Sequence, residues 1–263
     1  MKIKVEVSEA IDLAKRQKDK TFDLIFIDPP FGNNQADWDG TNEDFDFLLI
    51  SHLVRMLKTT GSFYIKCGIG PKSQSLIDFY NRVTPFVNEE KLIFQDMITW
   101  KKNRGRGNRK GWLQVQENFL WYTKSDRYVW NEKRQYLLEK RTFNILKKGN
   151  IPVNKSPYKR ITNVWTDINE FGFDGSPKEF HQKFEEVGHA TPTPEKIAER
   201  IIMLHTNPDD WIFDCFAGSG IVPLTAQKLE RNCIAGDRVQ KNVNYINNKI
   251  KNYIKPLFDD REE

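Results

Sequence analysis

The chain has 263 residues, of which 38% are hydrophobic, 13% aromatic and 29% charged, with a formal net charge of +5; this composition excludes disorder as the main state and suits one sizeable α/β domain or two small ones. The longest apolar run is far shorter than the roughly 20 residues that span a bilayer, and MKIKVEVSEA lacks the apolar core of a signal peptide. We therefore expect no membrane partner. Three cysteines without a CxxC pair and four histidines without ligand spacing lead us to expect no metal, no disulfide framework and a cytoplasmic location.

The N-terminal half alternates strand-like and helix-like stretches. Short apolar runs at 22–28, 61–67 and 91–100 predict buried strands, and amphipathic stretches at 45–58 and 73–83 predict helices between them. This βαβαβ alternation indicates a mostly parallel sheet with helices on both faces.

The positive charge is concentrated after the third strand, because residues 101–160 hold 17 basic and only 4 acidic side chains. A clustered basic patch is typical of a nucleic-acid-binding surface, although a solvated loop gives the same pattern. The glycine-rich stretch before Trp112 predicts a flexible basic loop that can grip nucleic-acid phosphates. Its candidate phosphate contacts are Arg104, Arg106, Arg109 and Lys110.

The rest of the chain is irregular first and regular again at its end. Residues 117–125 predict an antiparallel edge strand or a hairpin partner, and the periodicity degrades over 126–188, which we interpret as an irregular insertion. The later elements are a proline-started helix at 194–206, a strand and glycine turn at 210–220, a helix at 221–230, a strand at 231–237 and a terminal helix at 239–257.

Asp28-Pro29-Pro30-Phe31 follows the first predicted buried strand, at the end of a parallel sheet where ligands bind. Asp-Pro-Pro can simply end a strand with a rigid turn. However, a carboxylate, a free proline carbonyl and an exposed aromatic ring at one turn can together hold a planar base that carries an exocyclic amine.

A second strand end reads Asp214-Cys215-Phe216-Ala217-Gly218-Ser219-Gly220. Glycines there allow a ligand to approach the backbone, and the helix start that follows presents free N–H groups. Asp237 ends the next strand, where an acidic side chain can bind ribose hydroxyls. Pro223 breaks the full G-x-G-x-x-G pattern, which counts against a plain dinucleotide site, and a well-packed turn remains the alternative.

Together, DPPF at 28–31 and DCFAGSG at 214–220 resemble the catalytic DPP[YF] and cofactor FxGxG motifs of the DNA amino-methyltransferases, in the order typical of the β group of restriction-modification systems. HATPTPEKIAERII at 189–202, TWKK at 99–102, QENFLWYTKS at 116–125 and RNCIAGD at 231–237 also match. The resemblance leaves 126–188 unmatched.

The resemblance implies an α/β, Rossmann-like, doubly wound fold with a mostly parallel seven-stranded sheet and an irregular target-recognition insertion. Residues 1–125 would form the catalytic half, 126–188 the target-recognition region and 189–263 the cofactor-binding half. A homodimer and a cognate restriction endonuclease are the partners that the family suggests besides double-stranded DNA.

The resemblance also implies the reaction, methyl transfer from S-adenosylmethionine to adenine N6 of a base flipped out of the duplex. Asp28 and a carbonyl of Pro29 or Pro30 would accept the two amine N–H bonds, and Phe31 would stack on the base. By the same resemblance, the cofactor contacts are Asp28, His189, Asp214, Phe216, Gly218, Ser219, Gly220 and Asp237.

Two residue choices depart from the family and bear on its alternatives. Ile221 and Val222 replace two threonines after the glycine turn and remove hydroxyls that can contact the cofactor, and Phe31 replaces the commoner tyrosine. Cytosine-N4 methylation is the nearest alternative, disfavoured because that branch typically has serine where Asp28 stands. RNA and protein amide acceptors, and a catalytically idle DNA-binding relative, also remain open.

Overall fold

The structure is a computed structural model, and it describes residues 1–30, 47–68, 75–106, 110–140, 147–148, 151–152, 158–169 and 193–254. In this part of the chain no helix is long and apolar enough to cross a membrane. The three cysteines are free and buried.

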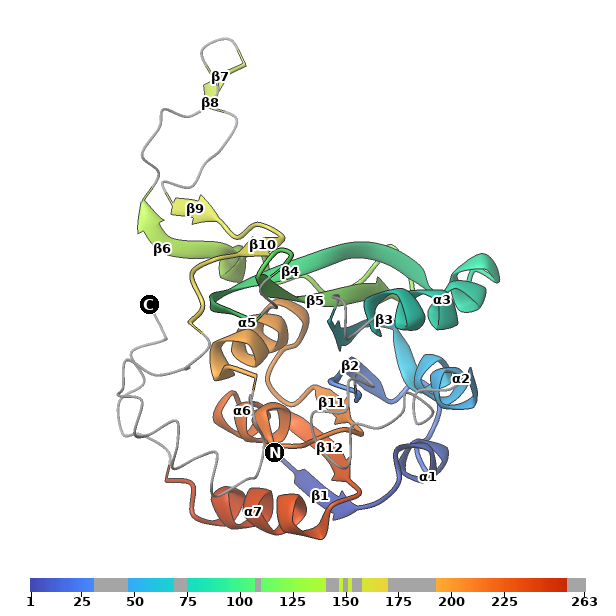
Figure 1. The fold of residues 1–263 in the computed structure, drawn as a ribbon. Coiled ribbons are helices and arrows are strands. Elements are labelled where there is room, and N and C mark those ends of the chain that lie inside the picture. The colour runs from blue at the N-terminus through green and yellow to red at the C-terminus, as the bar shows by residue number, and fades with distance from the viewer. Residues whose placement is uncertain are drawn as a thin grey trace.

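An eight-stranded sheet organises the molecule, in the order β1-β12-β11-β2-β3-β5-β4-β10 (Figure 1). All neighbouring pairs are parallel except those that β5 makes with β3 and β4. The strands are β1 (Ile3–Val7), β2 (Phe22–Ile27), β3 (Leu57–Cys67), β4 (Ile93–Arg106), β5 (Gln114–Thr123), β10 (Val164–Trp165), β11 (Trp211–Asp214) and β12 (Asn232–Asp237).

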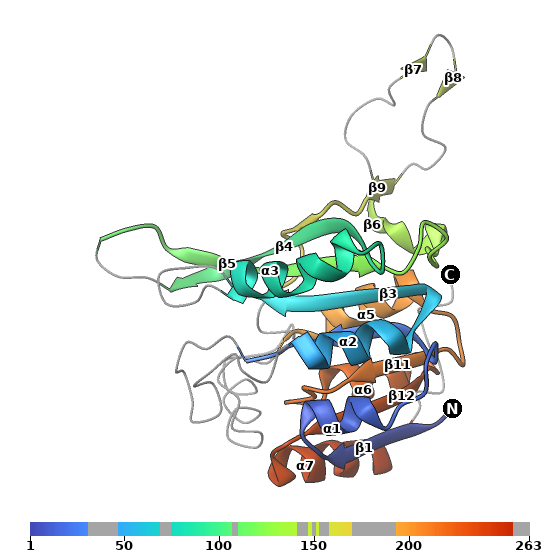
Figure 2. The ribbon, with the colours of Figure 1, turned by 90° about the vertical axis from the view of Figure 1, so that its right-hand side faces the viewer.

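Six α-helices of the described residues cover the two faces of this sheet, three on each side (Figure 2). Strand β2 shows why, because its alternate side chains Ile25 and Ile27 belong to one core cluster and Leu24 and Phe26 to the other. The first face is covered by α1 (Ala10–Lys15), α2 (Phe47–Met56) and α3 (Ser75–Asn88), and the second by α5 (Glu195–His205), α6 (Ile221–Lys228) and α7 (Gln240–Lys251).

The predicted doubly wound α/β class is confirmed, with one strand more than the seven expected. The extra strand is β10, whose Val164 and Trp165 pair with Thr99 and Trp100 of β4. Tertiary packing stabilises so short a strand, since Trp165 is buried and the indole N–H of Trp100 donates to the carbonyl of Ile168 at 2.9 Å. The strand predicted at 117–125 is the hairpin partner of β4 and lies inside the sheet, so it is no edge strand.

The rest of the described part of 126–188 consists of short elements beyond β4. These are the 3-10 helix η1 (Glu132–Gln135), the pair β6 (Tyr136–Lys140) and β9 (Tyr158–Arg160), and the pair β7 (Lys147–Lys148) and β8 (Ile151–Pro152). Figure 1 shows β7 and β8 far from the main sheet.

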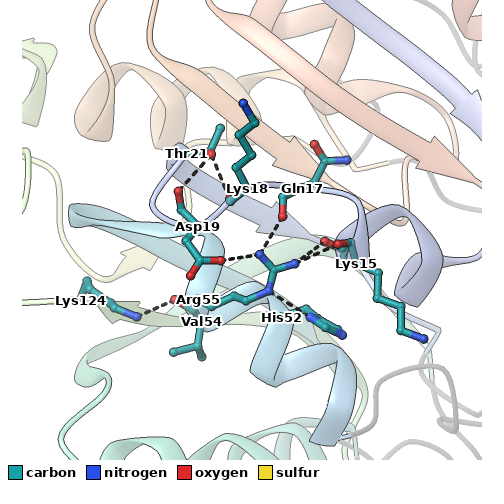
Figure 3. A network of polar contacts seen from close by, with 10 residues as sticks. Lys15, Gln17, Lys18, Asp19, Thr21, His52, Val54, Arg55 and Lys124 are labelled. Atoms are coloured by element: carbon teal, nitrogen blue, oxygen red, sulfur yellow. Dashed lines mark hydrogen bonds and ion pairs between the residues drawn. The ribbon is translucent and has the colours of Figure 1, made fainter.

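Arg55 fastens α1 to α2 at the amino ends of the strands (Figure 3). Its guanidinium donates to the carbonyls of Ala14 and Lys15 at 3.1 Å, to that of Gln17 at 2.7 Å, and to the Asp19 carboxylate at 2.7 Å. These carbonyls lie at and just beyond the end of α1, where few helical N–H donors remain. The network therefore has a structural role.

Candidate functional site

Asp28 directly follows β2, at the carboxyl edge of the sheet. Strand β2 is buried along its whole length, and the chain then enters Pro29 and Pro30, which have no N–H to continue a ladder. The Asp28 side chain is 38% exposed. The central strand thus delivers one accessible carboxylate to the edge where ligands of open α/β sheets bind.

One oxygen of this carboxylate is held by two donors. Oδ2 accepts a hydrogen bond from Lys66 Nζ at 2.8 Å and another from the Thr193 hydroxyl at 3.1 Å. Among the described residues, Oδ1 accepts none. The carboxylate is therefore fixed on one side and open on the other.

Lys66 belongs to a row of alternating charges that crosses four neighbouring strands. Its Nζ also lies 3.1 Å from Glu117 on β5, and Glu117 pairs with Lys102 on β4 at 2.6 Å. Burial alone would lower the pKa of Lys66, but Asp28 and Glu117 raise it above its usual value. Burial would likewise raise the pKa of Glu117, which Lys66 and Lys102 lower to about 2. Lys66 and Glu117, at the centre of this row, are consequently both ionised at neutral pH.

The glycine turn lies between β11 and α6, as predicted. Gly218 and Gly220 both have positive φ, 49° and 80°, a backbone region that favours glycine. A Cβ on Gly220 would lie 2.5 Å from Cγ1 of Ile246, so α7 packs directly against the turn. Any larger side chain at Gly220 would disturb both the turn and its packing.

Asp237 ties the end of β12 to this turn. Its Oδ2 accepts the Gly218 N–H at 2.8 Å, while Oδ1 accepts the Val239 N–H at 2.8 Å and the Asn242 side-chain amide at 3.1 Å. Because Oδ2 has one partner among the described residues, it keeps capacity for a further donor.

Asp214 lies between the other two carboxylates, at the end of β11. It is almost completely buried and accepts the Phe216 N–H at 2.9 Å. Burial raises the pKa of Asp214 well above its usual range, and the nearby Asp28 and Asp237 raise it further. Asp237, Asp214 and Asp28 thus end three adjacent strands, β12, β11 and β2, and place three carboxyl groups along this edge.

The remaining predicted cofactor residues divide into those that the structure describes and those outside it. Phe216 and Ser219 are half-buried in the glycine turn. Val222 is buried in the core and Ile221 packs against it, so these departures from threonine serve packing. Phe31 and His189 lie outside the described residues.

The basic segment differs from the predicted flexible loop. Residues 101–106 continue strand β4, and Arg106 pairs with Gln114 of β5. Along β5, Gln114 lies four residues beyond Asn118, so at about 3.3 Å per residue the paired Gln114 and Arg106 lie about 13 Å past the point where Thr99, Asn118 and Cys67 align. Cross-strand pairing therefore overrides the local glycine signal, and the segment forms a projecting arm (Figure 2).

This arm, residues 101–106 and 110–116, carries exposed side chains at its tip. Lys110 is exposed, Trp112 is 92% exposed and Leu113 is 62% exposed. The backbones of Arg104 and Arg106 lie on β4, whereas their side chains and all of Arg109 are outside the described part. The arm extends past the same edge as Asp28, because β4 runs parallel to β3.

The sequence reading missed the residues that hold Asp28. Lys66 is a lone cation in the apolar strand GSFYIKC, and a charge in a buried strand requires a partner. That signal was available, but the partner depends on strand order, because Asp28 is distant in sequence. Thr193 and Glu117 lie inside matched motifs without a predicted role. No group of described side chains could hold a metal ion.

Comparison with known proteins finds one family model. The N6/N4 DNA methylase model, described as DNA methylase, matches residues 22–248 and so spans both Asp28 and the glycine turn. Type II methyltransferase M1.MboII of Moraxella bovis is 28% identical over 263 aligned residues, covering 93% of this chain and 95% of that one. M.HpaI of Haemophilus parainfluenzae is 26% identical, covering 88% and 68%.

Solved structures share the fold. The crystal structure of the M1.HpyAVI-SAM complex aligns with a TM-score of 0.62 at 21% identity, covering 95% of this chain and 100% of that one. PvuII DNA methyltransferase, described as cytosine-N4-specific, aligns with a TM-score of 0.65 at 16% identity, covering 97% and 94%.

Proposed function

The chain belongs to the N6/N4 DNA methylase family and is a DNA amino-methyltransferase of restriction-modification type, and from this premise we propose that it methylates the N6 amine of adenine in double-stranded DNA. The observation that carries the choice of base is the carboxylate of Asp28, since the cytosine-N4 branch typically has serine at this position, and its accessible oxygen can accept an N–H of the amine. S-adenosylmethionine is the proposed methyl donor.

The residues at the carboxyl edge fit this cofactor. S-adenosylmethionine carries a sulfonium and an ammonium, and the edge gathers the carboxyl groups of Asp28, Asp214 and Asp237. Gly218 and Gly220 leave the backbone accessible. Asp237 retains acceptor capacity for a ribose hydroxyl.

Further cofactor contacts are proposed from their positions around the turn. Phe216, Ser219 and Asp214 would line the cofactor next to the glycines, and His189 would join them from outside the described residues. When bound, the cofactor supplies an electrophilic methyl group.

Asp28 acts on the nitrogen that receives the methyl group. An aromatic amine is a poor nucleophile, because its lone pair is delocalised into the ring. Hydrogen bonds from its two N–H groups to Asp28 Oδ1 and to the carbonyl of Pro29 or Pro30 favour a tetrahedral nitrogen. Positive charge then develops on that nitrogen, and the carboxylate stabilises it. Phe31 would stack on the flipped base.

The basic arm is the proposed DNA contact. Its cations Arg104, Arg106, Arg109 and Lys110 would neutralise phosphates, and Trp112 offers a flat apolar surface to bases. The paired strands of the arm extend about 13 Å past Cys67, at the edge that carries Asp28, so DNA held there can present a flipped base to Asp28. The region 126–188 remains the proposed target-recognition region, and a homodimer and a cognate endonuclease remain proposed partners.

The test is transfer of label from S-adenosylmethionine to unmethylated genomic DNA, followed by digestion to nucleosides. We expect label in N6-methyldeoxyadenosine that disappears with Asp28→Ala, while thermal unfolding shows that the variant is folded. Label in N4-methyldeoxycytidine would replace adenine with cytosine as the target base. Absence of label in DNA, with cofactor binding intact, would overturn the proposal and direct the search to RNA and protein acceptors.

A further inference from the structure

The hydrogen bonds of Asp28 are unequally divided between its two oxygens. Lys66 and Thr193 both donate to Oδ2, at 2.8 and 3.1 Å, and Oδ1 accepts nothing from the described residues. A carboxylate on a short side chain can rotate, and rotation would exchange the two oxygens. Two donors on one oxygen remove that freedom, so Oδ1 keeps a defined direction.

Lys66 is suited to hold a carboxylate in place because its own side chain is buried and held by two partners. Its side chain is 5% exposed and its Nζ is shared between Asp28 on one side and Glu117 on the other. These partners come from the strands that flank β3 in the sheet, β2 and β5. Lys66 is therefore anchored by the sheet, unlike a surface lysine that samples many rotamers.

A cation beside Asp28 carries a disadvantage for the proposed reaction, because it opposes the positive charge that develops on the amine. The neighbouring Glu117 offsets this effect, and Lys102 in turn neutralises Glu117 at 2.6 Å. The two carboxylates and the two lysines of the row, Asp28, Glu117, Lys66 and Lys102, have formal charges that sum to zero. The arrangement keeps the geometric benefit of Lys66 while limiting its electrostatic effect on Asp28.

We propose that Lys66 is a positioning residue for methyl transfer: it fixes Oδ2 of Asp28 with Thr193 so that Oδ1 faces the substrate amine, and Glu117 compensates its charge. The inference rests on the proposed function, since it assigns the oxygen that the amine uses. It predicts that Lys66 variants lose turnover and keep substrate binding.

The central experiment compares Lys66→Met with wild type in steady-state methylation. Displacing a reacting group by about 1 Å can lower the rate about 100-fold, so we expect a fall in kcat of that order, with KM for DNA and for S-adenosylmethionine within about threefold of wild type. Lys66→Arg keeps the charge and the donors, and should recover most of the lost kcat. A kcat of Lys66→Met within about threefold of wild type would overturn the proposal.

The matched control is Lys58→Met. Lys58 lies on the same strand and pairs with Asp23 of the same neighbouring strand, at 2.8 Å, but at the opposite edge of the sheet. We expect this variant to lose stability and to keep its kcat. An equal loss of kcat in both variants would show a general effect of removing a β3 lysine and would refute the specific role of Lys66.

Two milder variants decide the matter if Lys66→Met does not fold. Thr193→Val removes one donor to Oδ2 without changing any charge, and Glu117→Gln leaves Lys66 uncompensated. Each should lower kcat about tenfold, the first through geometry and the second through the positive charge left near the reacting nitrogen. Wild-type kcat in both variants would overturn the proposal.

A crystal structure of Lys66→Met without ligands separates this inference from the proposed function. We expect the Asp28 carboxylate to leave its position near Thr193, whether or not the protein methylates DNA. An unchanged carboxylate would refute positioning by Lys66. Failure of the wild-type protein to label any DNA would refute the proposed function, and the crystal structure would still decide whether Lys66 holds Asp28.

Discussion

The same two strands, β2 and β3, carry an Asp–Lys ion pair at each end, and the two pairs differ in one respect. At the amino edge, Asp23 uses both oxygens: Lys58 reaches Oδ1 at 2.9 Å and Oδ2 at 2.8 Å, and the Trp211 N–H reaches Oδ2 at 2.9 Å. At the carboxyl edge, Asp28 uses only Oδ2 within the described part of the chain. In the first pair both carboxylate oxygens accept hydrogen bonds, whereas in the second pair one oxygen accepts none from the described residues. We call them the closed pair and the open pair.

The difference teaches how to separate structural from functional charges in this fold. A buried charge that is fully paired stabilises the native state relative to its broken variants. An accessible carboxylate with an unused oxygen adds less to stability and remains available to a ligand. Exposure agrees with this distinction, because the Asp23 side chain is 8% exposed and that of Asp28 is 38% exposed.

The largest expected effect is the loss of turnover in Asp28→Ala. Removing a group that stabilises transition-state charge typically lowers kcat by about 100- to 1000-fold, and we expect the upper end here, because Asp28 also orients the amine. The free energy of unfolding should change by less than about 1 kcal/mol, since Lys66 retains Glu117. Steady-state methylation and urea unfolding measure the two quantities. A large loss of stability would break the comparison by making the open pair structural.

The next effect is a pH dependence of stability at the amino edge, where His205 ends α5. Nδ1 lies 3.0 Å from the carbonyl of Val129, which can only accept, so Nδ1 carries the proton and Nε2 accepts from the Tyr64 hydroxyl at 2.8 Å. Burial among aromatic rings, including Trp121 and Trp130, lowers the pKa of His205 to about 4.

Because the unfolded chain binds this proton more readily, the contribution of neutral His205 is complete above about pH 6.5 and is lost as the pH falls towards 4. A difference of this size corresponds to about 3 kcal/mol of stability. We expect urea unfolding of His205→Gln to lack that part of the acid destabilisation, because the amide keeps a donor and an acceptor without titrating. Identical pH slopes for the variant and wild type would contradict the assignment.

Asp23→Ala should have a smaller effect and one of opposite kind to Asp28→Ala. It leaves the Lys58 ammonium and the Trp211 N–H without their carboxylate, which we expect to lower the free energy of unfolding by about 2 kcal/mol. The half-exposed Lys58 can turn to water, which limits the effect. Turnover should stay within about twofold of wild type after correction for the folded fraction. A selective loss of kcat would contradict the structural role of the closed pair.

Sequence reasoning found the features whose signals are local. Asp28 directly follows an apolar strand, and Gly218 and Gly220 occupy a turn that favours glycine, so the strand end and the turn were predicted and lie where expected. Strand β10 was not predicted, because two residues show no periodicity and their pairing depends on β4.

The charge row escaped prediction for a related reason. Lys66, Glu117 and Lys102 become neighbours only through the order β3-β5-β4, which places a later strand between two earlier ones. For the basic segment, the prediction of a loop as far as Arg106 was wrong. The glycines around Arg104 and Arg106 favour a loop locally, but pairing with β5 extends the strand. Long-range register decided each of these cases.

The smallest effect that we predict concerns the exposed tip of the arm, which lies beyond the carboxyl edge of the sheet. Trp112 is 92% exposed, so Trp112→Ala removes almost no buried surface and should leave the free energy of unfolding unchanged. Stacking of one base on an aromatic ring contributes about 1–3 kcal/mol by alanine substitution, and we therefore expect DNA affinity to fall about tenfold, measured by fluorescence anisotropy at fixed salt. Ile254→Ala, which truncates another exposed side chain, at 86% exposure and away from the arm, should bind DNA like wild type. Equal DNA affinity of the two variants would show that Trp112 does not contact DNA. The functional surface would then be confined to the carboxyl edge of the sheet.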